Sequence, residues 1–495
     1  CTDSGTRTAA QNYLLAKNVD ISANVEFLIV PNNSVWVRDY GPNCVYANDV
    51  DSLYLIDWRY NRTTRQQDDT LANGVSRYLN LPLYTTTLAP ADLVHTGGNF
   101  MSDGLGTSFS SELILSENAA GNLYNASIKT EAQIDGIMQE YMGVDRFIKM
   151  DVLPYDGIHH IDMHMKLLDE QTLLVGKYPD GISDGPQIEA NIQYVLSNFK
   201  TAFGTPYKVI RIPMPPDATG RYPSNSGEYW TYANAVFINK SVLVPLYAEQ
   251  YDTTALRVWR EALPGYNIVG INSRALINLS GAIHCITKEI GVDDPLLITH
   301  QALPCMDNSN ELQYPVWANI QHRSGIASAK IYYTTDLAQP WQSVDLPPCQ
   351  SCDTSWSHLG YLPKQAAGST VFYFIEAAAN NGKVITRPLP APAAYWSFCV
   401  TETTSLAETP AASLQAIYPN PASAITAVPV MATAPVQANL RLFNMYGQLV
   451  QTVFEGRLPA GASTYFIDAS RLTSGTYWVQ LRSNGQTNVQ KLIVR

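Results

Sequence analysis

The sequence predicts an α/β or α+β region followed by two β modules. Over residues 1–302, short apolar runs typical of buried strands alternate with stretches of helical apolar spacing. From about Tyr314 the helical pattern disappears, and Pro, Gly and Asn clusters separate short strand-like runs, as in a β-sandwich. A chain of 495 residues has room for about three domains of ~150 residues each.

The predicted elements of the first region follow from apolar patterning. Two stretches, residues 187–199 and 255–263, have apolar side chains at helical spacing. Four short apolar runs predict buried strands: residues 25–30, 53–57, 172–176 and 242–245.

The remaining chain is predicted to be β-rich. Strands at residues 317–320, 329–333 and 371–375 indicate a β-sandwich over residues 303–400. The Thr/Glu/Ser-rich stretch within residues 401–413 predicts a linker, and residues 414–495 predict a last β module.

Composition excludes several classes of protein. The net charge of −11 argues against nonspecific binding of nucleic acid, and no run of about 18 apolar residues predicts a membrane span. Seven cysteines allow one free thiol beside disulfides. Cys349 and Cys352 have CxxC spacing, but no second ligand pair follows them, so a loop disulfide or two idle thiols is favoured over zinc. A lipid-modified Cys1 has little support in the sequence that follows it.

The residues with the clearest chemical meaning suit a guanidinium substrate. A guanidinium is a planar cation, so a site for it needs carboxylates on its N–H edges, a nucleophile for its carbon and a group that moves protons. Cys285 supplies the thiol, and His160 supplies the imidazole. Asp39 and Asp162 supply two carboxylates. For Cys285 alone, a buried structural cysteine is the plainer interpretation.

In a strand, residues two apart face the same side, so His160 and Asp162 are expected to line one pocket. The same spacing leaves a metal site open, because His159, His160, Asp162 and His164 all carry ligand atoms.

Two further segments predict binding of the rest of the substrate. Trp36 and Asp39 lie near a turn at Gly41, where a ring face and a carboxylate suit a planar cation. Arg62 and Arg65 in the next loop suggest a clamp for a carboxylate, although a solvated basic loop is equally compatible with them.

Two polar turns have both a functional and an ordinary interpretation. Gly97 and Gly98 permit a close backbone approach to a ligand, or form a plain glycine turn. Asn234 could bond a polar group of a ligand, or satisfy its own backbone.

Together these segments resemble the Porphyromonas-type peptidyl-arginine deiminases, relatives of agmatine deiminases in the guanidino-group-modifying (pentein) superfamily. The motifs Trp-x-Arg-Asp (36–39), Gly-Gly-Asn (97–99), His-x-Asp (160–162) and His-Cys-x-Thr (284–287) stand in family order over most of residues 1–302. The resemblance implies an α/β pentein-type five-bladed propeller of ββαβ units. Family members begin with a further strand and helix, so the first blade is expected to be incomplete or divergent here.

The resemblance also implies roles for individual residues. Cys285 would be the nucleophile and His160 the general acid/base, while Asp39 and Asp162 would bind the guanidinium. The implied substrate-binding residues are Trp36 on the substrate side chain, Arg62 and Arg65 on its C-terminal carboxylate, and Asn234 and the main chain of Ile158 on its backbone. Arg65 matches only if one inserted residue is allowed. The implied mechanism uses no metal or other cofactor.

The two β modules resemble known companions of the catalytic domain. Residues 303–400 look like the immunoglobulin-like domain of the peptidyl-arginine branch. Residues 414–495 look like the sorting domain of type IX secretion cargo, which implies the secretion machinery as a partner. A secreted or surface-attached protein of a Bacteroidota-like bacterium is expected, with arginine-containing peptides or proteins as substrates.

Three alternatives stay open at this stage. An agmatine or free-arginine deiminase differs chiefly in having no carboxylate to clamp. A catalytically inactive binding or adhesion protein would keep the fold without the chemistry, and a metal-dependent hydrolase would use the histidines of residues 159–164.

Overall fold

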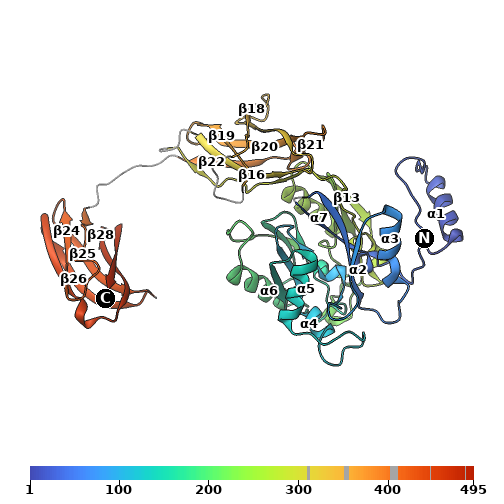
Figure 1. The fold of residues 1–495 in the computed structure, drawn as a ribbon, viewed down its shortest axis with the longest axis horizontal. Helices are drawn as coiled ribbons and strands as arrows, with labels where there is room; N and C mark the ends of the chain where they lie inside the picture. Colours follow the sequence, from blue (N-terminus) through green and yellow to red (C-terminus); the bar gives the residue numbers. More distant parts are fainter. Residues whose placement is uncertain (49, 309–312, 350–355, 402–410, 446, 485) are drawn as a thin grey trace. The chain divides into compact units, whose positions relative to one another are not determined.

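The computed structural model describes residues 1–48, 50–308, 313–349, 356–401, 411–445, 447–484 and 486–495. These residues form two compact units, Cys1–Thr401 and Glu402–Arg495, and each is described by itself. In Figure 1 the first unit contains all the labelled helices together with many strands, whereas the second contains strands and the short helical turn η6 (Ala469–Arg471).

Four ββαβ units make up the first part of the larger unit. In each, two antiparallel strands are followed by a helix, and the third strand then pairs parallel to the second. A parallel strand needs such a crossover connection, which explains the alternation seen in the sequence. The first two units are β1 (Asn43–Ala47), β2 (Ser52–Tyr60), α3 (Leu71–Leu79) and β3 (Leu83–Thr86), then β5 (Met101–Ser102), β6 (Thr107–Ser111), α5 (Glu131–Met142) and β7 (Arg146–Met150). The other two are β8 (Met165–Leu167), β9 (Thr172–Lys177), α6 (Gly185–Asn198) and β10 (Lys208–Pro213), then β11 (Val236–Ile238), β12 (Ser241–Leu246), α7 (Glu249–Ala262) and β13 (Asn267–Asn272).

Most of the predicted elements are confirmed. The strands expected at residues 53–57, 172–176 and 242–245 lie in β2, β9 and β12, and the two expected helices are α6 and α7. The strand expected at residues 25–30 is wrong, because this segment is irregular. Its backbone bonds run to Cys1, which accepts from Val30 N and donates to Leu28 O, so no described strand pairs with it.

Helix boundaries follow local chemistry. In α5, Thr130 forms a capping box with Gln133, and Gly143 ends the helix in the left-handed conformation at φ +64°. In α6 the apolar side chains at helical spacing, Ile188, Ile192 and Val195, are all buried against the sheets. By contrast α1 (Ser4–Ala16) buries none of its residues.

The connections between the units contain short helical turns rather than extended chain. The turns that matter below are α2 (Val37–Tyr40), η2 (Gly97–Asn99), η3 (Ile161–Met163) and η5 (His284–Ile286). Because α2 contacts both η2 and η5, and η2 contacts η3, residues far apart in the sequence meet at one place. The remaining short elements here are η1 (Asp68–Thr70), β4 (Val94–His95), α4 (Leu113–Glu117), η4 (Pro223–Asn225) and α8 (Arg274–Ile277).

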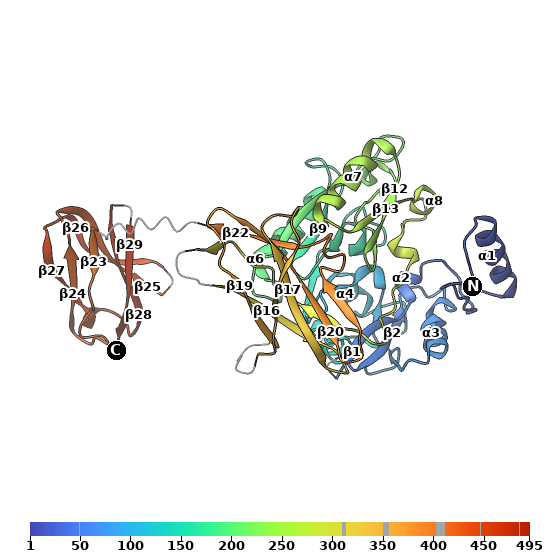
Figure 2. The same ribbon diagram turned by 90° about the horizontal axis from the view of Figure 1, so that it is seen from above.

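A two-sheet β structure follows within the same unit, as Figure 2 shows. One sheet has the order β14 (Leu297–Thr299), β16 (Gln313–Gln321) and β19 (His358–Pro363). The other has the order β15 (Met306–Asp307), β22 (Trp396–Thr401), β20 (Thr370–Ala379), β17 (Ile326–Thr334) and β18 (Gln342–Asp345), with β21 (Val384–Arg387) beside β20. The strands expected at residues 317–320, 329–333 and 371–375 are confirmed as parts of β16, β17 and β20.

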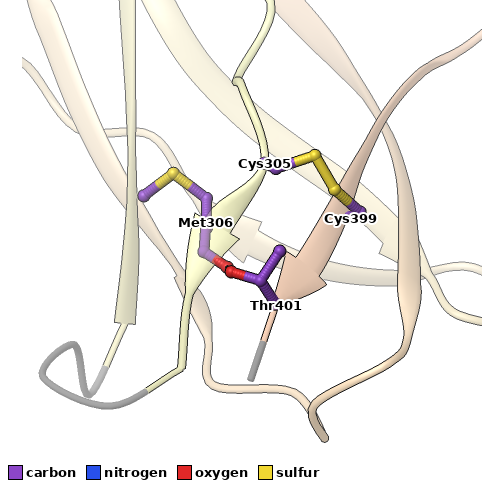
Figure 3. Close-up of a disulfide and its surroundings, with 4 residues drawn as sticks. All are labelled: Cys305, Met306, Cys399 and Thr401. Atoms are coloured by element: carbon purple, nitrogen blue, oxygen red, sulfur yellow. A yellow bond between two sulfur atoms is a disulfide. The ribbon is translucent and has the colours of Figure 1, made fainter. Parts of the chain in front are cut away.

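A disulfide links the two ends of this region. Cys305 and Cys399 are bonded beside the parallel pair β15 and β22, where Thr401 donates a hydrogen bond to Met306 O at 3.2 Å (Figure 3). Cys349 is disulfide-bonded as well, whereas Cys352 and most of the predicted linker lie outside the described residues.

The second unit is also built from two sheets around its own apolar core. Its sheets are β23 (Ala412–Leu414), β24 (Ile425–Ala432) and β27 (Gly461–Asp468), and β26 (Leu449–Leu458), β25 (Val436–Asn444), β28 (Gly475–Ser483) and β29 (Gln486–Val494). Among the helices of the described chain, none combines the length and apolar character needed to cross a bilayer.

Candidate active site

Most of the residues that the sequence singled out line one cavity of about 200 Å³. Its lining comes from five separate segments of the chain, which the helical turns bring together. The lining residues are Trp36, Asp39, Tyr60, Arg62, Arg65, Ile158, His160, Leu279, Ser280 and Cys285.

Two glycines allow the segments that line the cavity to pack closely against one another. A Cβ added at Gly98 would lie 2.4 Å from His160 Nδ1 and 3.0 Å from Asp39 Oδ1. A Cβ added at Gly281 would lie 2.5 Å from the Trp36 ring. The close approach expected at the Gly-Gly turn is therefore made to the site's own side chains.

Asp39 and His160 form one wall of the cavity. Asp39 Oδ1 accepts a hydrogen bond from Gly98 N at 3.1 Å and lies 3.6 Å from His160 Nδ1. Burial lowers the pKa of His160, against the opposing effect of the Asp39 carboxylate. Neither ring nitrogen of His160 has a hydrogen-bond partner within the described chain, so a neutral imidazole is available to a ligand.

Cys285 lies at the buried end of the cavity with 2% of its surface exposed. Its Sγ is 3.3 Å from Asn234 Nδ2 and 3.8 Å from Asp162 Oδ2. Burial raises the pKa of this thiol, and the carboxylates of Asp162 and Asp39 raise it further. The thiol is therefore protonated when no cation is bound, and a cation placed between it and the carboxylates would favour the thiolate.

Asp162 lies beneath the cavity lining. Its Oδ2 is 2.6 Å from His284 Nδ1, while Oδ1 has no hydrogen-bond partner among the described residues. Burial raises the pKa of this carboxyl, and Asp39 raises it further. A fully buried carboxyl with one unused oxygen can accept bonds from a guanidinium.

The local structure expected around His160 and Asp162 is wrong. These residues lie in and before the turn η3, because His160 is extended at the start of the turn and Asp162 is inside it. A strand would have put His160, Asp162 and His164 on one side, but no three His, Cys, Asp or Glu side chains of the described chain are arranged to hold a metal ion.

Asn234 supports Cys285 from behind. It is fully buried, and its Oδ1 accepts a hydrogen bond from His284 N at 3.1 Å. Its Nδ2 faces Cys285 Sγ, and it does not line the cavity. Ile158 does line the cavity, and its N–H donates to Asp156 Oδ1 at 3.1 Å.

One side of the cavity, called the rim here, is formed by Tyr60, Arg62 and Arg65. Arg62 donates to Asn61 O at 2.8 Å, and Arg65 donates to Tyr60 Oη at 3.3 Å. Both arginines are half-buried, and neither forms an ion pair within the described chain, so their charge is available to an anion.

Sequence reasoning missed several residues at this site, including Tyr60. Arg38 is buried, donates to His284 O at 3.2 Å and pairs with Glu289 at 2.5 Å, so it ties two of the converging segments together. Its place inside the Trp-x-Arg-Asp motif was the available signal. Ser280 and Leu279 lie in a segment without a distinctive pattern.

A thiol, a neutral imidazole and carboxylates at the ends of ββαβ units define a class of site suited to a planar cation. The Porphyromonas-type peptidyl-arginine deiminase model matches residues 1–290, more than half of the chain. The protein therefore belongs to this family, whose members are hydrolases acting on guanidino C–N bonds.

Several proteins of known sequence or structure are similar to this chain. A protein of Vibrio parahaemolyticus named "putative agmatine deiminase" is 26% identical over 296 residues, which is 54% of this chain and 79% of the relative. The solved structure of a "putative arginine deiminase" from Porphyromonas gingivalis is 24% identical, with a TM-score of 0.48, over 58% of this chain and 82% of that one. An agmatine deiminase of Enterococcus faecalis is 23% identical, with a TM-score of 0.48, over 56% and 80% of the two chains.

The C-terminal unit has a separate assignment. Residues 416–495 match a secretion-system C-terminal sorting domain. This match indicates type IX secretion, with the secretion machinery as a partner.

Proposed function

We propose that this protein hydrolyses the guanidinium of a C-terminal arginine in peptides or proteins to citrulline and ammonia. The observation that carries the proposal is that the cavity holding Cys285, His160 and Asp39 also holds Arg62 and Arg65. Carboxylates and a thiol suit the cationic end of an arginine, and two unpaired guanidinium groups suit its carboxylate end.

The proposed reaction begins when the two carboxylates bind the positively charged guanidinium of the substrate. Asp39 and Asp162 accept hydrogen bonds from the substrate guanidinium and hold its carbon against Cys285. The cation lowers the pKa of the thiol, whose proton passes to His160. The thiolate attacks the central carbon and forms a tetrahedral adduct.

Two proton transfers by His160 complete the cycle. His160 protonates the departing nitrogen, the C–N bond breaks, and ammonia leaves a covalent thiouronium on Cys285. His160 then takes a proton from water, whose oxygen attacks the same carbon. The C–S bond breaks, the proton on the new C–OH group passes to the Cys285 sulfur, and the ureido product leaves. His160 then releases its proton to the solvent, where it converts ammonia to ammonium. In this scheme Trp36 packs on the aliphatic part of the substrate, and Asn234 holds Cys285 and the His284 backbone in place.

The proposal also includes the fold of the catalytic domain, the domain bounds and the location of the protein. The four ββαβ units belong to a pentein-type propeller of five such blades. The proposed domains are residues 1–302, 303–400 and 414–495, with the second immunoglobulin-like and residues 401–413 as a linker. Two strands extend past these bounds, because β14 already pairs with β16 of the second domain and β23 begins at Ala412. The protein acts outside the cell or attached to its surface.

Agmatine is the second candidate substrate, because the relatives found by sequence are named "putative agmatine deiminase". Agmatine has no carboxylate, so it would leave the charges of Arg62 and Arg65 unused. Citrulline-type product and ammonia should be measured from an arginine-terminated peptide, the same peptide with a C-terminal amide, a peptide with internal arginine, and agmatine. Faster turnover of the free-acid peptide supports the proposal, whereas preferential turnover of agmatine assigns the protein to the small-molecule branch. Absence of turnover with all four would favour a binding protein.

A further inference from the structure

Behind the rim lies a buried carboxyl group that the proposed reaction does not use. Glu117, at the end of α4, has 6% of its surface exposed. Its Oε1 accepts hydrogen bonds from Asn61 Nδ2 at 2.7 Å and from Tyr124 Oη at 3.3 Å. Its Oε2 has no hydrogen-bond partner in the described part of the chain.

Glu117 is connected to Arg62 through a single residue. Asn61 is 1% exposed, donates its side-chain amide to Glu117, and accepts the Arg62 guanidinium on its main-chain oxygen. The carboxyl group therefore holds the residue that positions Arg62. No charged partner within 4 Å neutralises Glu117 in the described chain. The charge of Glu117 therefore changes the electrostatic potential at Arg62.

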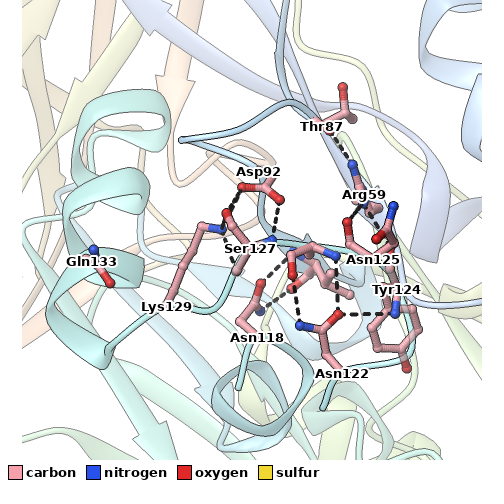
Figure 4. Close-up of polar contacts among 12 residues, drawn as sticks. Arg59, Thr87, Asp92, Asn118, Asn122, Tyr124, Asn125, Ser127, Lys129 and Gln133 are labelled. Atoms are coloured by element: carbon pink, nitrogen blue, oxygen red, sulfur yellow. Dashed lines mark hydrogen bonds and ion pairs between the residues drawn. The ribbon is translucent and has the colours of Figure 1, made fainter. Parts of the chain in front are cut away.

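The far side of Glu117 is fixed by the loop that carries Tyr124. Arg59 donates to Tyr124 O at 2.8 Å and to Asn125 O at 2.9 Å, as Figure 4 shows. The buried ion pair between Lys129 and Asp92, at 2.8 Å, fixes the end of the same loop. Glu117 thus lies between two anchored segments.

We propose that Glu117 sets the specificity of the site for a substrate carboxylate through its charge state. In its neutral form Glu117 leaves the full positive charge of Arg62 to the substrate. In its ionised form it offsets that charge and weakens the preference for a free carboxylate. This inference rests on the proposed function, in which Arg62 binds the C-terminal carboxylate.

The direction of the pH effect follows from burial. Burial raises the pKa of Glu117 to about 7, although its bonds to Asn61 and Tyr124 and the charge of Arg62 act in the opposite direction. Asp39 is the other charged group that acts on it, and it raises the pKa. Glu117 is therefore mostly neutral at pH 6 and mostly ionised at pH 8, so the preference for a free carboxylate should decrease as the pH rises.

The test compares kcat/KM for two substrates that share the same reacting groups. The pH dependence of those groups cancels in the ratio of the two values. kcat/KM is measured from pH 6 to 8 for one arginine-terminated peptide as its free acid and as its amide. The ratio of the two values should fall roughly three- to tenfold over this range, as expected for one charge at partial screening. In Glu117→Gln, which keeps an acceptor for Asn61, the ratio should stay at its pH 6 value throughout.

The control variant is Glu112→Gln, which removes an exposed carboxylate at the start of the same helix; it should behave as the wild type. A wild-type ratio above one that does not change with pH, or an unchanged pH dependence in Glu117→Gln, overturns the inference. A ratio of one at every pH instead overturns the carboxylate clamp, and absence of turnover of both peptides overturns the proposed reaction. A melting temperature for each variant separates these outcomes from unfolding.

Discussion

The two ends of the cavity differ in how firmly the protein holds their side chains. At the inner end, Cys285 and Asp162 are buried and are fixed by Asn234 and His284. At the rim, Arg62 and Arg65 are half-buried, and each has one hydrogen bond to its own loop. In the proposed reaction, the inner end provides the chemistry and the rim selects the substrate.

The difference has a physical reason. Groups that develop charge during the reaction must be preorganised in a site from which water is excluded. Groups that recognise the remote end of a substrate contribute binding energy and can tolerate more movement. Changes at the inner end should therefore reduce kcat, and changes at the rim should raise KM for a particular kind of substrate.

The largest expected effect comes from Cys285→Ala. Without the nucleophile, kcat for every arginine substrate should fall by roughly 10⁴-fold or more. Because only the sulfur atom is lost, the melting temperature should change little. Residual turnover close to the wild type, measured as ammonia release, would contradict the assignment of Cys285.

The next largest effect is expected for Gly98→Ala. The new methyl group would lie 2.4 Å from His160 Nδ1, so His160 and Asp39 must move apart. A displacement of this size should cost about 100-fold in kcat. The matched control is Gly136→Ala in α5, where nothing lies within 4 Å of the added Cβ; its activity should be unchanged. Equal kcat values for the two variants would show that the inner end is not tightly positioned.

Arg62→Ala tests the rim. Loss of one charge-assisted hydrogen bond, about 1.5–3 kcal/mol, should raise KM for the free-acid peptide about 10- to 100-fold. KM for the amide and kcat for both peptides should be nearly unchanged. The exposed Arg77 on α3 provides the control substitution. An equal loss for acid and amide would mean that Arg62 supports the fold or the reaction instead.

The pH profile with the amide peptide probes the inner end alone. Burial raises the pKa of Asp162 above its ordinary value, and its ionised form is needed to bind the cation. kcat/KM should therefore rise several-fold between pH 6 and 8, and kcat should change less, because the bound guanidinium keeps Asp162 ionised. A flat or falling kcat/KM profile would show that Asp162 is already ionised in the free enzyme.

The smallest effect is expected for Arg65→Ala. Its hydrogen bond to Tyr60 is long, at 3.3 Å, and its place in the loop matches the family pattern less well. KM for the free-acid peptide should rise only about two- to fivefold. If the effect instead equals that of Arg62→Ala, the two arginines bind the carboxylate together.

The sequence predicted those features that depend on local pattern. Apolar periodicity predicted β2, β9, β12, α6 and α7, and the motifs contained most of the titratable residues that line the cavity. Residues 25–30 have the composition of a strand, but a strand also needs a hydrogen-bonding neighbour, which no local pattern encodes.

The site also contains relationships that no spacing rule describes. Asp162 was expected on the same strand face as His160, and it lies instead in a turn beneath the cavity, paired with His284. Glu117 was not predicted at all, because its meaning depends on its burial beside Asn61 and Arg62, which come from a distant segment. Such contacts between segments are set by tertiary packing.

The mass of the protein during turnover shows directly whether Cys285 is the nucleophile. The wild-type protein should be quenched in acid while it reacts with an arginine-terminated peptide, and then digested and analysed by mass spectrometry. We expect an adduct on Cys285 with the mass of the peptide less one ammonia. Citrulline formation without an adduct on Cys285, or with an adduct on another residue, would contradict this role of Cys285.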